Sequence, residues 1–230
     1  PEYAHMPNIL GNDGKKLSKR TGDTSVSEYL KKGYLVEALL NFIALLGWHP
    51  KRDIEIMSME EMIEFFQIKD IHKAGAVLDP IKLDWMNGEY IKKMPLPELH
   101  ERLANYLETY EADFYRDIFA QQEFTFNSKI LAELQGRMKR FDAFVGLTRF
   151  FYSDVAIRSD LLVSQKMKIE NVDFAKESLQ LVQEVLSSGD FSTMDTLKEP
   201  LLAAIANAGR KNGQVLWPLR IALSGEEFSP

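Results

Sequence analysis

Residues 25–47 read SVSEYLKKGYLVEALLNFIALLG, and they establish a helical pattern that the rest of the chain repeats. Ser25 is followed three residues later by Glu28, the spacing of a capping box, in which two otherwise unpaired backbone amides at a helix start each gain a side-chain acceptor. Apolar residues then recur every three or four positions until Gly47, namely Leu35, Leu39, Phe42, Ile43 and Leu46. The pattern predicts an amphipathic helix that ends at a glycine.

Similar signals recur along the whole sequence. Ser58 and Glu61 repeat the capping-box spacing, and Asp79-Pro80 has the order of an N-cap residue followed by a first-turn proline. Apolar stripes predict a long helix over about 127–152 and a last helix over 213–223. The sequence has no sustained alternation of apolar and polar residues, which is the mark of a half-buried strand. The sequence therefore predicts an all-α protein.

The stiffest interruption in the chain is Pro95-Leu96-Pro97. Because 230 residues suffice for one large domain or two small ones, we place a boundary there and predict domains over 1–95 and 96–230. A chain that begins at Pro1, without a methionine, is expected to be a piece of a longer protein.

Composition excludes several classes of protein. The absence of cysteine rules out a disulfide scaffold, a thiolate metal site and a cysteine nucleophile. Four scattered histidines argue against a histidine-rich metal site, so no protein-bound metal is predicted. No apolar run approaches the roughly 18–20 residues that cross a bilayer. We therefore expect a cytoplasmic protein with no membrane partner.

The net charge of −6 conceals a positive surplus in two segments. The chain holds 28 Lys+Arg against 34 Asp+Glu, yet residues 1–52 carry eight basic groups against five acids, and residues 198–220 carry four against one. Each segment therefore nets +3. Separate basic faces on an acidic body are compatible with a polyanion that touches selected surfaces, although charge blocks are also common on plain solvated faces.

Residues 11–20, GNDGKKLSKR, are the stretch that most resembles a chemical site. Two glycines permit tight turns, and four cations occupy six positions beside Ser18. Such a loop suits a phosphate chain, because ammonium groups neutralise charge and a hydroxyl donates a hydrogen bond. The glycine and lysine spacing of a Walker loop is absent. The alternative is an exposed basic loop without a ligand.

The loop and its surroundings resemble one family in several places. Residues 16–20, KLSKR, look like the lysine-serine-lysine signature near the ATP site of class I aminoacyl-tRNA synthetases. Further segments resemble bacterial-type glutamyl-tRNA synthetase, in the order that this family has: residues 3–7 (YAHMP), 14–20 (GKKLSKR), 39–48 (LLNFIALLGW), 79–88 (DPIKLDWMNG) and 218–225 (PLRIALSG). The chain is thus similar to the C-terminal half of that enzyme, the part that includes the KLSKR loop.

The resemblance implies a ligase that joins glutamate to tRNA(Glu) through glutamyl-adenylate, with ATP and its Mg²⁺ as substrate. Lys19 would be catalytic, stabilising charge on the α- and β-phosphates as pyrophosphate leaves. Lys16, Ser18, Lys19 and Arg20 would bind ATP. The dinucleotide-fold catalytic domain with the glutamate pocket would precede this chain, so the chain alone is expected to be inactive.

The resemblance also implies a helical stem-contact region followed by a helical-cage domain that binds the anticodon. Its expected tRNA-binding residues are Trp217, Leu219, Arg220 and Arg210. Unpaired bases stack on aromatic and guanidinium planes, which suits Trp217 and Arg220. Plainer interpretations stand beside these: Trp85 and Trp217 as packing residues, Arg220 paired with an acid, and Arg210 near a helix end as a partner of the helix dipole.

Two further hypotheses remain beside the ligase. The chain is also compatible with a non-catalytic tRNA-binding module, or with a helical interaction scaffold whose basic loop has no ligand. Salt-dependent binding of tRNA separates the scaffold from the other two.

Overall fold

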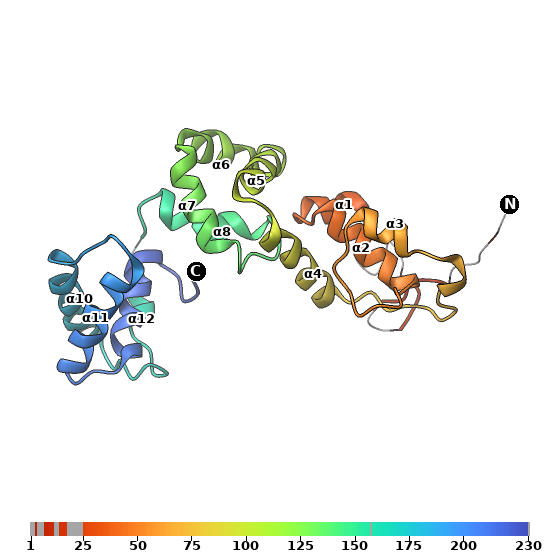
Figure 1. Cartoon of the computed structure of the whole chain (residues 1–230). Helices are drawn as coiled ribbons and strands as arrows, with labels where there is room; N and C mark the ends of the chain where they lie inside the picture. Colours follow the sequence, from red (N-terminus) through yellow and green to blue (C-terminus); the bar gives the residue numbers. More distant parts are fainter. Residues whose placement is uncertain (1–2, 4–6, 12–13, 18–24, 157, 230) are drawn as a thin grey trace. The chain divides into compact units, whose positions relative to one another are not determined.

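The computed structural model describes residues 3, 7–11, 14–17, 25–156 and 158–229. Across these ranges the chain forms twelve α-helices and two short 3₁₀ helices (Figure 1). The β pairing found there consists of isolated bridges, such as the one between Leu10 and Lys16. The all-α prediction is confirmed.

The chain divides into two compact units, residues 1–146 and 147–230. The first unit contains α1 (Val26–Lys31), α2 (Val36–Gly47), α3 (Met59–Phe65), η1 (Ile68–Asp70), α4 (Pro80–Lys93), α5 (Leu96–Tyr110), α6 (Ala112–Asp117), η2 (Phe119–Gln121) and α7 (Phe124–Leu134). α8 (Ala143–Tyr152) spans the division. The second unit continues with α9 (Ser159–Leu162), α10 (Val172–Ser187), α11 (Met194–Asn207) and α12 (Asn212–Ser224).

The proline segment separates two helices of the first unit. Pro95 is the N-cap residue of α5 and Pro97 lies in its first turn, directly after α4. The helix break that the two prolines predict is therefore present, while a domain boundary between residues 95 and 96 stays a prediction.

The helix starts that were predicted from local spacing are confirmed. Ser25 Oγ accepts from Glu28 N at 3.3 Å while Glu28 Oε2 accepts from Ser25 N at 3.3 Å. Ser58 and Glu61 make the same reciprocal pair at the start of α3. Asp79 Oδ1 accepts from Ile81 N at 2.9 Å, and Pro80 is the first residue of α4.

The core of the first unit lies where the stripe of α2 meets α4. Leu39 and Phe42 of α2 pack with Leu83 and Met86 of α4, and all four side chains are buried. Burial of each such side chain stabilises the fold by about 1.5–3 kcal/mol. This packing fixes α4, and hence the segment 79–88, against α2.

The prediction of one long helix over 127–152 is wrong. α7 ends at Leu134 and α8 begins at Ala143, with a bend at 135–142 between them. Gln135 Nε2 donates to the carbonyl oxygens of Ile91 at 2.9 Å and Met94 at 2.6 Å, at the end of α4. The bend is thus held by hydrogen bonds to a helix some forty residues away.

Gly33 packs directly against the backbone of this bend. Its φ is +78°, and a Cβ at this position would lie 2.5 Å from Phe141 N. Phe141 N donates to Gly33 O at 3.2 Å. A glycine is required here, because any side chain would meet the backbone of the bend and would also hold a left-handed conformation.

The second unit is built around α10 and α12 (Figure 1). Ala175 of α10 and Ile221 of α12 are buried in one cluster with Leu162 and Ile169. A second cluster joins Val182 of α10, Ile205 of α11 and Val215 of α12. α12 is therefore anchored along its length. Across the part of the chain that the structure describes, no helix is both long and apolar enough to cross a membrane.

Candidate functional site

The basic loop lies partly inside the described residues. Lys16 is described, whereas Ser18, Lys19 and Arg20 lie outside the described residues. Lys16 is exposed and forms an isolated antiparallel bridge with Leu10.

The described part of the loop turns back on itself, as its glycines predict. Gly14 N donates to Gly11 O at 2.9 Å, and Gly11 N donates to Lys15 O at 2.8 Å. Gly14 has a φ of +71°, a conformation that glycine adopts without steric penalty. Leu17 N donates to Ile9 O at 2.9 Å and continues the pairing beyond Lys16.

The turn is attached to the segment that precedes α4. Leu10 N donates to Ala76 O at 2.9 Å, and Leu78 N donates to Leu10 O at 2.8 Å. Leu17 lines an apolar pocket together with Phe42 and Leu78. The backbone beneath Lys16 is therefore fixed while its ammonium group faces solvent, an arrangement that presents a cation to an anionic ligand.

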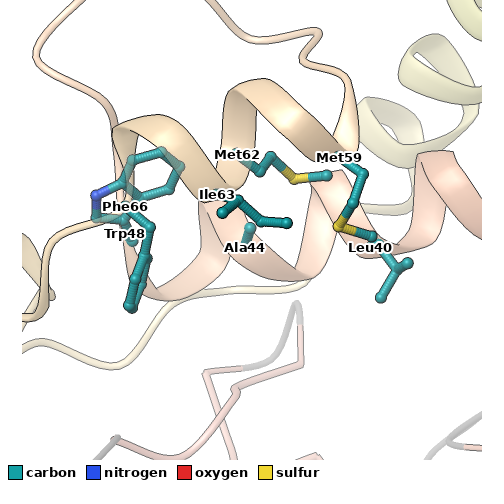
Figure 2. A pocket seen from close by; sticks show the side chains of 7 residues that line it. All are labelled: Leu40, Ala44, Trp48, Met59, Met62, Ile63 and Phe66. Carbon is teal, nitrogen blue, oxygen red and sulfur yellow. The ribbon is translucent and has the colours of Figure 1, made fainter.

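A second pocket lies between α2 and α3, and its lining is entirely apolar. Figure 2 shows Met59, Met62 and Ile63 of α3 facing Leu40 and Ala44 of α2, and the pocket is completed by Trp48 and Phe66. The rings of Trp48 and Phe66 meet edge to face with centroids 5.8 Å apart. None of these side chains carries a charge, so the pocket offers no group that would pair with the phosphates of ATP.

The segment 79–88 directs two polar side chains inward. Asn87 is fully buried: its Oδ1 accepts from Leu35 N at 2.8 Å and its Nδ2 donates to Lys139 O at 2.5 Å. Asp84 accepts a hydrogen bond from the Tyr34 hydroxyl and lies 3.4 Å from Arg140 Nη1. Both residues hold the fold together, and Trp85 between them is 42% exposed.

The surroundings of Tyr34 raise the pKa of its hydroxyl group. Burial, reinforced by the hydrogen bond to Asp84, raises the pKa of Tyr34 from 10.0 to about 12. Arg140 opposes the shift and also lies over the Tyr34 ring, with its guanidinium carbon 5.6 Å from the centroid. The cluster thus joins α4, the turn after α1 and the 135–142 bend.

Three of the expected tRNA-binding residues lie on α12. Arg220 is exposed, with Nη1 3.4 Å from Glu227 O. Trp217 is half-buried, and its Nε1 donates to Leu161 O at 2.8 Å. Leu219 packs on the cluster of Val182, Ile205 and Val215. Of the three, Arg220 presents its charge to solvent, while Trp217 and Leu219 hold α12 in place.

The fourth expected tRNA-binding residue, Arg210, lies just before α12, and its side chain binds residues of α10. Its Nη2 lies 2.6 Å from Glu177 Oε2, and its Nη1 donates to Ser178 Oγ at 2.5 Å and to Phe174 O at 3.2 Å. The guanidinium also lies over the Phe174 ring, 4.3 Å from its centroid. Its side chain is only 17% exposed, so Arg210 supports α12 through α10. Sequence reasoning missed Glu177 and Ser178, which lie more than thirty residues away and follow no local pattern.

Among the described residues, no group of three or more His, Cys, Asp or Glu side chains is arranged to hold a metal ion.

Two family models match the chain. Residues 83–230 match the model described as "Anticodon binding domain". Residues 1–85 match the model "tRNA synthetases class I (E and Q), catalytic domain". The two matches meet within α4, and the basic loop lies in the second of them.

Relatives of known function are similar over the whole chain. Glutamate–tRNA ligase of Clostridium acetobutylicum is 37% identical and that of Clostridium tetani 40% identical, each over 100% of this chain and 45% of the relative. The crystal structure of a glutamate tRNA ligase from Elizabethkingia meningosepticum, in complex with its amino acid, superposes with a TM-score of 0.77 at 29% identity, over 100% of this chain and 47% of that one. Glutamate-tRNA synthetase from Elizabethkingia anophelis gives 0.73 at 28% identity, over 100% and 46%. The chain spans a little under half the length of these proteins.

Proposed function

The chain belongs to the anticodon binding domain family, and from this premise we propose that it is the tRNA-recognising part of a glutamate–tRNA ligase. The observation that carries the proposal is the match of residues 83–230 to that family, in a chain whose relatives along its full length are glutamate–tRNA ligases. The longer protein would join glutamate to tRNA(Glu) in the cytoplasm.

The basic loop would serve the ATP site of that ligase. Lys16 supports this role, because it extends an exposed cation from a turn fixed by backbone hydrogen bonds. Lys19 would stabilise the negative charge on the α- and β-phosphates while glutamate's carboxylate displaces pyrophosphate and forms glutamyl-adenylate. Ser18 and Arg20 would orient the same phosphates, and Mg²⁺ would arrive with ATP.

The α12 end of the second unit would bind the anticodon. Arg220 supports this role, since an exposed guanidinium can stack on an unpaired base or donate to its edge. Trp217 and Leu219 would shape the surface beside it. Arg210 would contribute indirectly, because its ion pair holds α10 against the segment that leads into α12.

Binding of tRNA by the 230-residue chain tests the proposal. We would measure the affinity for tRNA(Glu) and for the same tRNA with altered anticodon bases, at two salt concentrations. We expect tRNA(Glu) to bind more tightly, and the Arg220→Ala substitution to remove about tenfold of that preference, as the loss of a base contact would. Arg149→Ala is the matched control, because Arg149 is an exposed arginine of the same unit that lies on α8 and not on α12.

Equal binding of the two tRNAs would overturn the anticodon role. Binding that is absent, or that does not weaken with salt, would favour the helical scaffold instead, because RNA contacts release counterions.

A further inference from the structure

We propose that Lys166, Lys168 and Lys211 form a phosphate-binding face beside the start of α12. This face would hold the sugar-phosphate backbone of the tRNA, whereas Arg220 further along α12 would contact bases. The inference rests on the proposed function and deepens it, because it names a second contact surface of different chemistry.

Two of the lysines lie on a tight turn at residues 164–169. Ser164 N donates to Ile169 O at 3.1 Å, and Ile169 N donates to Ser164 O at 2.9 Å, which closes the turn. Lys168 N donates to Gln165 O at 3.0 Å inside it. Ile169 is buried in the core of the second unit, while Lys166 and Lys168 are exposed. The turn is therefore anchored, and its lysines face solvent.

Gln214 joins this turn to Lys211. Its Nε2 donates to Lys168 O at 3.3 Å, and its Oε1 accepts from Lys211 N at 2.9 Å. Gly213 leaves room for the turn, because a Cβ at this position would lie 2.9 Å from Met167 Sδ. The turn and the first residues of α12 are thus adjacent in the second unit.

Exposed Glu170 lies two residues beyond Lys168, yet no ion pair forms between an acid and the lysines of this surface among the described residues. Two nearby cations have partners: Arg210 pairs with Glu177 at 2.6 Å, and Lys176 pairs with Asp173 at 3.8 Å. Lys166, Lys168 and Lys211 have no ion-pair partner in the part of the chain that the structure describes. Three unpaired cations that lie close together are compatible with a polyanionic ligand at this face.

Lys168 gives the face an additional signature. Its φ is +59°, in the left-handed region. This backbone conformation is sterically unfavourable for lysine, whereas glycine adopts it freely and asparagine and aspartate tolerate it. A lysine at a position that favours glycine is unfavourable for folding, which is consistent with a use for its side chain outside the fold. Folding and binding should therefore respond in opposite directions when this residue is changed.

The test combines stability and tRNA binding in the 230-residue chain. We expect Lys168→Gly to unfold at the same or a higher urea concentration than the parent chain while it binds tRNA(Glu) more weakly. We expect the triple variant K166Q/K168G/K211Q to weaken binding by the same factor for tRNA(Glu) and for the tRNA with altered anticodon, because phosphate contacts carry no sequence information. When the salt concentration rises from about 50 to 200 mM, the affinity of the parent chain for tRNA should fall. The affinity of the triple variant should fall by a factor that is about threefold smaller for each phosphate contact removed.

Lys198→Gln is the control for the effect of net charge, and it removes one positive charge where the triple variant removes three. Lys198 is exposed in α11, about 13 Å along the helix from the end that leads to α12. A triple variant that binds tRNA no more weakly than Lys198→Gln, or whose salt dependence equals that of the parent chain, would overturn the phosphate-binding face. If the parent chain itself shows no salt-dependent tRNA binding, the proposed function fails, and the face fails with it.

Discussion

The Tyr34 hydroxyl makes the stability of the first unit sensitive to alkaline pH. The pKa of Tyr34 is raised from 10.0 to about 12, chiefly by burial and then by the hydrogen bond to Asp84. In the unfolded chain this phenol loses its proton near pH 10, whereas the folded chain retains it up to about pH 12. Between these values the unfolded state binds fewer protons, so the stability that is present below pH 10 is lost as the pH rises.

We therefore expect the free energy of unfolding, measured with urea, to fall from about pH 10 to about pH 12, and to fall less steeply in Tyr34→Phe. Part of the slope should remain in that variant, because burial also raises the pKa values of Tyr90 and Tyr106 to about 12. A Tyr34→Phe slope equal to that of the parent chain would contradict the assignment.

At the level of single residues, the sequence predicted roles well where the partner is close in the chain. Ser25, Ser58 and Asp79 bond to amides two or three residues away, so their spacing alone identified them. Arg210 was expected to bind tRNA, yet its partners on α10 lie 32 to 36 residues away and no local pattern announces them. A basic residue near a helix end looks the same in sequence whether it faces RNA or a neighbouring helix.

At the level of elements, the bend between α7 and α8 shows where periodicity loses its predictive value. The apolar spacing across 127–152 fits one helix, because it records only which residues turn inward. The break depends on Asn87 and Gly33, which bind or accommodate the bend from other parts of the chain, and on Gln135 of the bend itself, which donates to the end of α4. Tertiary hydrogen bonds outweigh local helix preference at this point.

Asn87 should be the most sensitive point of this arrangement. Replacing Asn87 with alanine removes an acceptor from Leu35 N and a donor from Lys139 O, and leaves both backbone groups without that partner at a buried position. Because each such loss costs about 1–3 kcal/mol, we expect Asn87→Ala to lower the free energy of unfolding by about 2–4 kcal/mol.

Asn105→Ala is the matched control for urea unfolding, since Asn105 is an exposed asparagine of α5 and should change stability by no more than about 0.5 kcal/mol. Similar values for the two variants would show that Asn87 does not hold the bend.

At the level of the whole molecule, the all-α class was predictable because helix starts and stripes recur along most of the chain. The likeness to glutamyl-tRNA synthetases depended on short segments in each of the two family matches. Residues 14–20 lie in the catalytic-domain match and residues 218–225 in the anticodon-binding match. Contacts between residues that are far apart in the sequence could not be predicted. The contact of the 164–169 turn with α12 relies on the space left by Gly213 and on the hydrogen bond from Gln214 Nε2 to Lys168 O, neither of which the sequence indicates.

Recognition and chemistry should separate when the 230-residue chain is assayed by itself. The ligases it resembles are about twice as long, and activation of glutamate needs a pocket for the amino acid as well as the basic loop. We therefore expect the chain to bind tRNA(Glu) but to show no glutamate-dependent exchange of pyrophosphate into ATP. In a full-length ligase carrying this sequence, Lys19→Ala should reduce that exchange by roughly 10²–10³-fold, because a cation that stabilises transition-state charge is lost. Lys69→Ala, a change of an exposed lysine in η1, should leave it unaltered. Exchange by the 230-residue chain alone would place the glutamate pocket within these residues and contradict the division of labour proposed for it.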